Sequence, residues 1–98
     1  MLVKIHDSYR TTVAICDSNL LEKTFEENEK QIVITKNFFG GEEKTADEIL
    51  QIMEEYAGSD STFNIVGPES VALALKSRLI RPEGITKIQE IPIALVLL

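Results

Sequence analysis

The alternation of hydrophobic and polar positions predicts β-strands at both ends of the chain. Residues 1–6 and 11–16 each alternate with a period of two, and the segment between them is rich in turn-forming residues. This pattern predicts an N-terminal β-hairpin in which His6 pairs with Thr11. Residues 93–98 are apolar at successive positions. Such a run predicts a strand that is covered on both faces of a sheet or buried in a dimer interface.

The middle of the chain predicts two further strands and the segments that connect them. Residues 31–35 are rich in β-branched side chains, and residues 61–66 form a mostly apolar run that ends at Gly67. Asp17 and the two residues after it end the second strand, and they are expected to cap a short helical turn. The charged residues 26–30 predict a solvated connector.

Two helices are predicted from their start signals and from apolar residues at every third or fourth position. Thr45 and Glu48 have the spacing of a capping box, and Gly58 marks the expected end of the first helix. The second helix is expected to start at Pro68 and to extend to about Leu79. The predicted core-facing positions are Ala46, Ile49, Leu50, Met53, Tyr56 and Ala57 in the first helix, and Val71, Ala72, Leu75 and Leu79 in the second.

The order of these elements predicts an α/β fold of the α+β type. We expect a single mixed β-sheet with an N-terminal β-hairpin and two main helices packed on it. A right-handed βαβ crossover is expected to run through the second helix. A chain of 98 residues, 44% hydrophobic and 27% charged, fits one compact domain, residues 1–98.

The net charge of -6 weighs against direct nucleic-acid binding, because nucleic-acid binders usually carry a concentrated basic face. Lys76, Arg78 and Arg81 form the one basic cluster, at the end of the second helix. Cations at that position also complement the helix C-terminus. These three residues are the RNA-contact candidates, and nucleic acid is otherwise expected only through a protein partner.

The chain is expected to be cytoplasmic and to have no membrane contact. Residues 93–98, the longest apolar run, are far short of the roughly 20 residues that a membrane-spanning helix needs. Residues 1–6 lack the basic region and the long apolar core of a signal peptide. Cys16 is the single cysteine, so internal disulfides and cysteine-based zinc patterns are excluded. No cofactor is predicted.

His6 and Cys16 are the only residues of their types, which makes them the first candidates for a nucleophilic pair. In a hairpin that pairs His6 with Thr11, Cys16 lies five residues further along its strand. That spacing places it about 16 Å away and on the opposite face. One imidazole with unspecified carboxylates is too weak a pattern to predict a metal site. The sequence therefore predicts neither a catalytic residue nor a metal ligand.

The junction between the fourth strand and the second helix is a candidate ligand pocket, because free N–H groups collect at such helix starts. Asn64 lies inside an apolar strand, where its amide needs a hydrogen-bond partner. Gly67 permits a close backbone approach, and Ser70 lies in the first helical turn. His6 is expected to reach the same pocket from a neighbouring strand. The proline and glutamate after Gly67 oppose an anionic ligand.

Two loops are the candidate contact surfaces for a protein partner. Tyr9 and Arg10, at the tip of the predicted hairpin, are residue types that anchor interfaces. Phe38 and Phe39 enter a loop expected at residues 38–43. Successive residues of an extended chain point to opposite sides, so at least one of these rings is expected in the core.

Three segments carry a resemblance to a known family. They are Leu2-Val3-Lys4-Ile5-His6 with Tyr9-Arg10, Thr62-Phe63-Asn64-Ile65-Val66-Gly67 with Glu69-Ser70, and Ile91-Pro92 with Ala94-Leu95-Val96-Leu97. Over essentially its whole length, the chain resembles the small archaeal proteins grouped as "domain of unknown function 424". The resemblance implies an archaeal cytosolic protein, and it implies no reaction, cofactor or catalytic residue.

The leading hypothesis is a non-enzymatic protein-binding module, set in a translation- or RNA-associated assembly. The alternative is a small enzyme or small-ligand binder, with its pocket at the corner formed by Asn64, Gly67 and Ser70. A third hypothesis is direct RNA binding through the basic cluster. Homodimerisation through the apolar C-terminal strand is compatible with all three.

Overall fold

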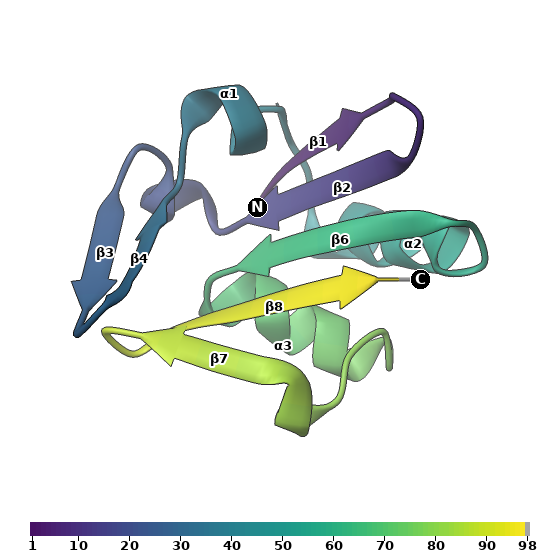
Figure 1. Ribbon diagram of the computed structural model, residues 1–98. Helices are drawn as coiled ribbons and strands as arrows, with labels where there is room; N and C mark the ends of the chain where they lie inside the picture. The colour runs from purple at the N-terminus through teal and green to yellow at the C-terminus, as the bar shows by residue number, and fades with distance from the viewer. Residues whose placement is uncertain (98) are drawn as a thin grey trace.

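The computed structural model describes residues 1–97 and shows the predicted mixed α/β fold (Figure 1). These residues form a six-stranded sheet, a separate two-stranded sheet and three helices. The strands are β1 (Leu2–His6), β2 (Thr11–Cys16), β3 (Thr24–Glu27), β4 (Lys30–Val33), β5 (Glu42–Glu43), β6 (Ser61–Val66), β7 (Ile85–Ile88) and β8 (Ile91–Leu97). The helices are α1 (Lys36–Phe39), α2 (Ala46–Ala57) and α3 (Pro68–Lys76), with short 3₁₀ turns η1 (Ser18–Leu20) and η2 (Pro82–Gly84). Leu98, which belonged to the predicted final strand, lies outside the described residues.

The main sheet has the strand order β5-β1-β2-β6-β8-β7. Its neighbouring strands are antiparallel except for β2 and β6, which are parallel. The connection between these two strands contains α2. β6 and β7 are both antiparallel to β8 and are therefore parallel to each other, so α3 forms the expected crossover through the second helix, with β8 inserted between the two strands that it connects. After α3 the chain forms the β7–β8 hairpin. Gln89 and Glu90 form its two-residue turn with positive φ values of 50° and 67°, and β8 returns antiparallel to β6.

The N-terminal hairpin is present, but its register differs by one residue from the prediction. His6 pairs with Thr12 rather than Thr11, so the loop between the paired residues has five residues instead of four. Cys16 therefore lies on the same face of the sheet as His6, and not on the opposite face. The two residues are still separated by roughly 13 Å along the strand direction, which keeps their side chains apart.

The segment expected to be a charged connector followed by a strand of the main sheet forms a hairpin of its own. β3 and β4 pair with each other, and Asn28 in their turn has a φ of 57°. Phe25 and Ile32 lie opposite one another on the half-buried face of this hairpin. The charged side chains that suggested a connector lie mainly on its exposed positions. Local charge thus concealed an amphipathic hairpin.

The two faces of the main sheet are covered to different extents. One face packs against α2 and α3, which lie behind the sheet in Figure 1, and this layer forms the main core. The opposite face is covered only in part by η1, α1 and the β3–β4 hairpin, which contribute to a second core around Ala14, Cys16 and Val66. The fold is therefore closed on one side of the sheet and partly open on the other.

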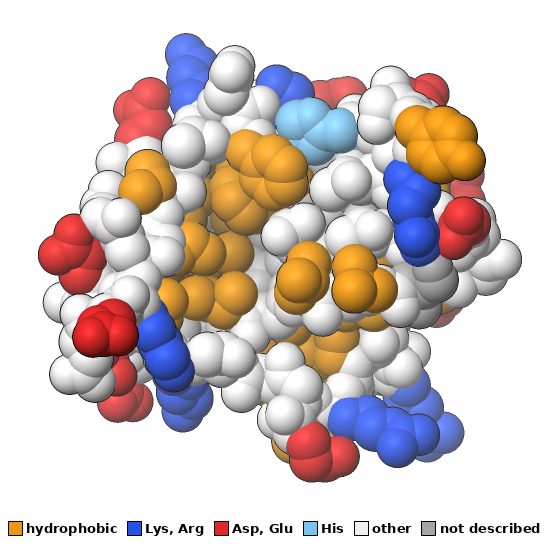
Figure 2. Space-filling model, viewed as in Figure 1, with side chains coloured by type: hydrophobic (Ala, Val, Ile, Leu, Met, Phe, Trp, Pro, Cys, Tyr) orange, Lys and Arg blue, Asp and Glu red, His pale blue; other side chains and the backbone are white. Residues whose placement is uncertain are grey.

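The uncovered part of that second face follows from the strand register. We call this uncovered area the open face. It consists of one row of residues across the sheet, His6, Thr12, Thr62 and Leu97, and of Asn64 and Leu95 from the next row. Leu95 and Leu97 are 59% and 71% exposed, so the final strand is not covered on both faces within a single chain. Figure 2 views this side of the molecule, where hydrophobic side chains are visible near the middle of the surface.

The start of α2 is confirmed in detail, while the buried faces of both helices differ from the predicted ones. The Glu48 N–H donates to the Thr45 hydroxyl at 3.2 Å, and the Glu48 carboxylate accepts from the Thr45 N–H at 2.9 Å. These bonds lower the pKa of the Glu48 carboxyl. Against prediction, Ala46, Ala57 and Ala72 are exposed, Ala74 is buried, and α3 ends at Lys76 rather than at Leu79.

Removing the Thr45 hydroxyl tests this helix start. Thr45→Ala is expected to lower the free energy of unfolding by about 1 kcal/mol, because the Glu48 N–H loses its acceptor. Thr45→Ser keeps the hydroxyl and is the matched control. Urea denaturation of the three proteins measures the difference. Equal midpoints for the alanine and serine variants would show that the capping box does not stabilise α2.

Candidate functional site

The strand–helix corner predicted as a ligand pocket is occupied by a carboxylate of the protein itself. Asp17, which directly follows β2, is only 2% exposed. Its two oxygens accept hydrogen bonds from the backbone N–H of Glu69 at 3.0 Å and from the N–H of Ser70 at 2.8 Å. The Ser70 hydroxyl also donates to Asp17 at 2.8 Å. Asp17 therefore caps α3 from the adjacent strand, and its charge is placed where the helix start favours an anion.

The remaining backbone groups at this corner also have partners. The Gly67 N–H donates to the Pro92 carbonyl at 2.9 Å, and the Val71 N–H donates to the Gly67 carbonyl at 2.9 Å. Pro68 has no N–H to satisfy. Pro92, which lies opposite Gly67 in β8, has no N–H to donate. None is needed there, because the Gly67 carbonyl already accepts from the Val71 N–H of α3. Gly67 and Ser70 thus serve the fold, and no N–H between residues 67 and 71 is left for a ligand.

Gly67 is required at the corner for two physical reasons. Its φ of +113° lies in a region that side chains disfavour. A Cβ placed there would come within 2.4 Å of the Asp17 carboxylate carbon. Sequence reasoning identified the glycine but missed Asp17, which we had assigned to the turn η1. Its side chain makes no cap bond to η1. The sequence signal that could have revealed Asp17 was a helix that starts at Gly67-Pro68 and has no capping side chain of its own.

His6 and Asn64 share the open face but do not form a pair. Asn64 lies two residues further along the sheet and two strands away from His6, a Cα separation of roughly 12 Å. His6 Nε2 instead lies 2.8 Å from the Phe38 carbonyl oxygen, and its ring stacks on Phe38 at 4.8 Å between centroids. Acid–base work between His6 and Asn64 would need hydrogen-bond reach, which this register does not provide.

Cys16 is a buried core residue. It packs in the second core, and burial together with the charge of Asp17 raises the pKa of its thiol to about 11. A thiol with that pKa is almost entirely protonated at neutral pH, so its nucleophilicity is low. Its distance along the strand from His6 also excludes direct activation by the imidazole.

One of the two phenylalanines lies in the core, as predicted, but the loop expected at residues 38–43 is not present. Its first residues end the helical turn α1, whose Phe38 N–H donates to the Thr35 hydroxyl at 3.1 Å, and its last two form β5. Phe39 is 4% exposed and belongs to the second core, while Phe38 is half-buried and packs edge-on against it at 5.0 Å. Phe39 is therefore inaccessible to a partner, while Phe38, which stacks on His6 of the open face, is accessible in part.

The tip of the β1–β2 hairpin presents an exposed aromatic side chain on a turn that local bonds hold. Tyr9 is fully exposed, at 105% of the reference area. On one side of it, the Ser8 hydroxyl donates to the Arg10 carbonyl at 3.1 Å. Arg10 forms an ion pair with Asp60 at 2.8 Å, which links the tip to the loop between α2 and β6. Asp60 was missed from the sequence because nothing local relates it to Arg10.

The basic cluster at the end of α3 does not form one continuous basic groove. Lys76, Arg78 and Arg81 are all exposed. Arg78 has a φ of 64° and lines a pocket of about 380 Å³ that also contains Glu54 and Met53. Arg81 lines a different pocket, of about 430 Å³, on the far side of the turn beside β8. Arg78 and Arg81 thus line different pockets, and the pocket of Arg78 also contains a carboxylate.

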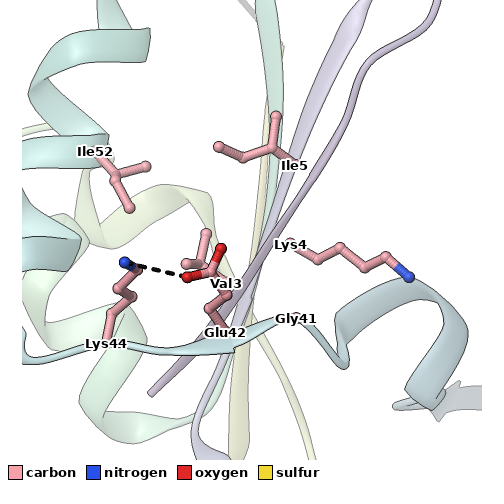
Figure 3. Close-up of a pocket in the computed structure, with 7 residues that line it drawn as sticks. All are labelled: Val3, Lys4, Ile5, Gly41, Glu42, Lys44 and Ile52. Carbon is pink, nitrogen blue, oxygen red and sulfur yellow. Dashed lines mark ion pairs between the residues drawn. The ribbon is translucent and has the colours of Figure 1, made fainter.

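A third pocket, of about 410 Å³, lies at the other edge of the sheet, where β5 ends (Figure 3). Ile5 of β1 and Ile52 of α2 border it, and Lys44 forms an ion pair with Glu42 at 3.4 Å. Lys4 points away toward α1 and donates to the Asn37 carbonyl at 2.8 Å. The pocket combines apolar and charged side chains, and both of its lysines already contact oxygen atoms of the protein.

Residues 1–97 contain no group of three His, Cys, Asp or Glu side chains placed to hold a metal ion. Within the same residues, none of the helices is long and apolar enough to cross a membrane.

Comparison with known proteins identifies a family and a fold. A family model described as "Protein of unknown function (DUF424)" matches residues 6–98. A solved structure described as "Crystal structure of an uncharacterized conserved protein from Methanopyrus kandleri" superimposes with a TM-score of 0.79. The two chains are 21% identical, and the match covers 97% of this chain and 88% of that one. At this identity the likeness shows the shared fold alone. No curated protein matches the chain.

Replacing Asp17 tests whether the corner is structural. Asp17→Ala is expected to lower the free energy of unfolding by on the order of 3 kcal/mol, because the half-buried Glu69 N–H and the buried N–H and hydroxyl of Ser70 lose their acceptor. Asn19→Ala, at an exposed position in η1, is the control and is expected to change stability by less than about 0.5 kcal/mol. Urea denaturation measures both variants. An equally small effect for the two substitutions would contradict a structural role of Asp17.

Proposed function

Because the chain belongs to the DUF424 family, whose description names no activity, we propose its function from its own surface: a non-enzymatic protein-binding module that engages its partner through the tip of the β1–β2 hairpin. The observation that carries the proposal is the complete exposure of Tyr9 on an ordered turn. A tyrosine ring in water leaves a large apolar area unburied. The ring is among the side chains that most often dominate binding energy at interfaces.

The order of the tip supports its use as an anchor. The Arg10–Asp60 ion pair and the Ser8–Arg10 hydrogen bond hold the turn in one shape before any partner arrives. A turn whose backbone is already held loses less conformational freedom on binding, so more of its contact energy appears as affinity. The matching partner surface is an apolar pocket with a polar atom at its base for the tyrosine hydroxyl.

The surroundings of His6, Cys16 and Asp17 favour binding over catalysis. The imidazole of His6 is hydrogen-bonded to the Phe38 carbonyl, the Cys16 thiol is buried, and the Asp17 carboxylate caps α3. Each candidate catalytic group thus has a structural role. The proposal includes a translation- or RNA-associated assembly as the setting, reached through a protein contact. The net charge of -6 and the separation of Arg78 and Arg81 into different pockets favour that route over direct RNA binding.

Replacing Tyr9 tests the proposal. Tagged protein is incubated with an archaeal cell extract, with and without RNase, and captured proteins are quantified by mass spectrometry. We expect a stoichiometric partner that survives RNase and is lost with Tyr9→Ala. An anchoring aromatic contributes about 2 kcal/mol or more, which corresponds to a roughly 30-fold weaker affinity. Titration of the purified partner against both proteins then measures this ratio.

Val33→Ala is the matched control, because Val33 is 47% exposed on β4, an element separate from the hairpin tip. Its capture profile is expected to equal that of the unmodified protein. A partner retained equally by Tyr9→Ala and Val33→Ala would rule out the tip as the contact. Partners lost only on RNase treatment would indicate that RNA bridges the interaction instead of a direct protein contact.

A further inference from the structure

The pocket where β5 ends combines an apolar wall with two opposite charges (Figure 3). Ile5 and Ile52 form one side of it, and the Glu42 carboxylate and the Lys44 ammonium lie on the other side. We call this site the β5 pocket. Its volume of about 410 Å³ is within the usual range for small-molecule sites. A matching ligand carries charges at one end and an apolar group at the other.

The strand pairing explains why these side chains meet. Glu42 lies directly opposite Val3, so both side chains are on the face of the sheet that carries α2. Ile5 and Lys44 are each two residues further along their own chains, and they therefore share that face. The chain crosses close to β1 just before β5, where a Cβ at Gly41 would lie 1.9 Å from the Val3 carbonyl oxygen. Only glycine permits this crossing.

The two charges retain hydrogen-bonding capacity for a ligand. Lys44 Nζ lies 3.4 Å from the Glu42 carboxylate, which is longer than the roughly 2.7–2.9 Å of a charge-assisted hydrogen bond. An ammonium has three donors and a carboxylate about four acceptor sites, and within residues 1–97 neither group forms a second ion pair. The side chains of Lys44 and Glu42 are 29% and 80% exposed, so solvent and solutes reach both.

The backbone of Ile5 adds a donor and an acceptor on the same side of β1. The Met1 carbonyl accepts from the Lys44 N–H, so the backbone groups of residue 1 point outward, toward β5. The direction alternates along a strand, and residues 3 and 5 therefore also point outward. β5 pairs with β1 only at residues 2 and 3. In the part of the chain that the structure describes, the outward N–H and C=O of Ile5 have no hydrogen-bond partner.

We propose that the β5 pocket binds a free α-amino acid with an apolar side chain. The carboxylate of the ligand accepts from the Lys44 ammonium and from the Ile5 N–H, and its ammonium donates to the Glu42 carboxylate. Its side chain lies between Ile5 and Ile52. The two charges of an α-amino acid are separated by a single carbon, which matches a site where an ammonium and a carboxylate are neighbours.

The combination of charges discriminates against related ligands. A simple carboxylic acid would place an anion close to Glu42 without a compensating cation, and a simple amine would place a cation close to Lys44. A polar side chain would lose water against Ile5 and Ile52 without gaining a hydrogen-bond partner there. An apolar zwitterion meets all three conditions.

Titration of the isotope-labelled full chain, followed by two-dimensional NMR, tests the proposal with leucine as the probe. The amide signals of Ile5, Glu42 and Lys44 are expected to shift with a dissociation constant on the order of 1 mM, since the charges at the mouth are partly exposed. Glycine, which lacks the apolar group, is expected to bind roughly tenfold more weakly. Leucinamide lacks the carboxylate and N-acetylleucine lacks the ammonium, and each is expected to bind about fivefold more weakly than leucine.

Two charge-removing variants identify the ligand group that each side chain contacts. Lys44→Gln is expected to bind leucine about fivefold more weakly, while its affinity for leucinamide does not fall, because that ligand has no carboxylate to lose a partner. Glu42→Gln is expected to show the same pattern with N-acetylleucine. Lys30→Gln removes an exposed cation on β4, outside the pocket, and is the matched control. Unchanged circular dichroism and urea midpoints establish that the variants fold.

Leucine that shifts none of the pocket signals up to about 20 mM overturns the proposal. So do equal affinities for leucine, leucinamide and N-acetylleucine, or a Lys30→Gln variant that binds leucine as weakly as Lys44→Gln does. Tighter binding of leucinamide would replace the free amino acid by the first residue of a peptide, and tighter binding of N-acetylleucine by the last. The inference is independent of the proposed function, because the β5 pocket does not include Tyr9 and the NMR titration requires no partner protein.

Discussion

The bonds from the Asp17 carboxylate to the first N–H groups of α3 are the interaction on which the rest of the structure depends. They join the end of β2 to the helix that follows β6, the strand parallel to it. In doing so, they hold α3 against one face of the sheet at a fixed position. A buried carboxylate needs several donors to offset the loss of water, and the helix start and Ser70 provide them. Gly67 leaves the space in which that carboxylate lies.

The same interaction decides where the protein can act. A helix start beside a glycine corner is a common anion site in α/β proteins, but here the anion is part of the chain. The chemistry available at the corner therefore serves stability. The hairpin tip, on which the proposed function rests, lies elsewhere and presents Tyr9 fully exposed.

Signals confined to one segment of the sequence predicted local structure well. Thr45 and Glu48 located the start of α2, and Gly67 with Pro68 located the start of α3, because capping and backbone restrictions act within a few residues. The family resemblance was likewise confirmed by a match over residues 6–98. The expectation that at least one of the adjacent Phe38 and Phe39 lies in the core was confirmed, although the two residues belong to a helical turn and not to the extended segment from which the expectation was argued.

Features set by long-range contacts could not be predicted in the same way. The role of Asp17 depends on a helix more than fifty residues later in the chain, and the Arg10–Asp60 ion pair depends on two loops that meet only in the fold. The hairpin register differed by one residue, because turn composition does not specify loop length. The charged residues of β3 and β4 concealed a hairpin whose apolar side, Phe25 and Ile32, is stabilised only by packing on the second core.

The most direct test of this account is residue-resolved amide hydrogen exchange of the native protein, observed at Glu69 and Ser70. N–H groups in the first turn of a helix have no partner within the helix and normally exchange quickly. If Asp17 binds both groups, their exchange is slowed by roughly a thousandfold or more, to the level of the central strands β2 and β6. Rapid exchange at both residues, beside well-protected central strands, would contradict the account.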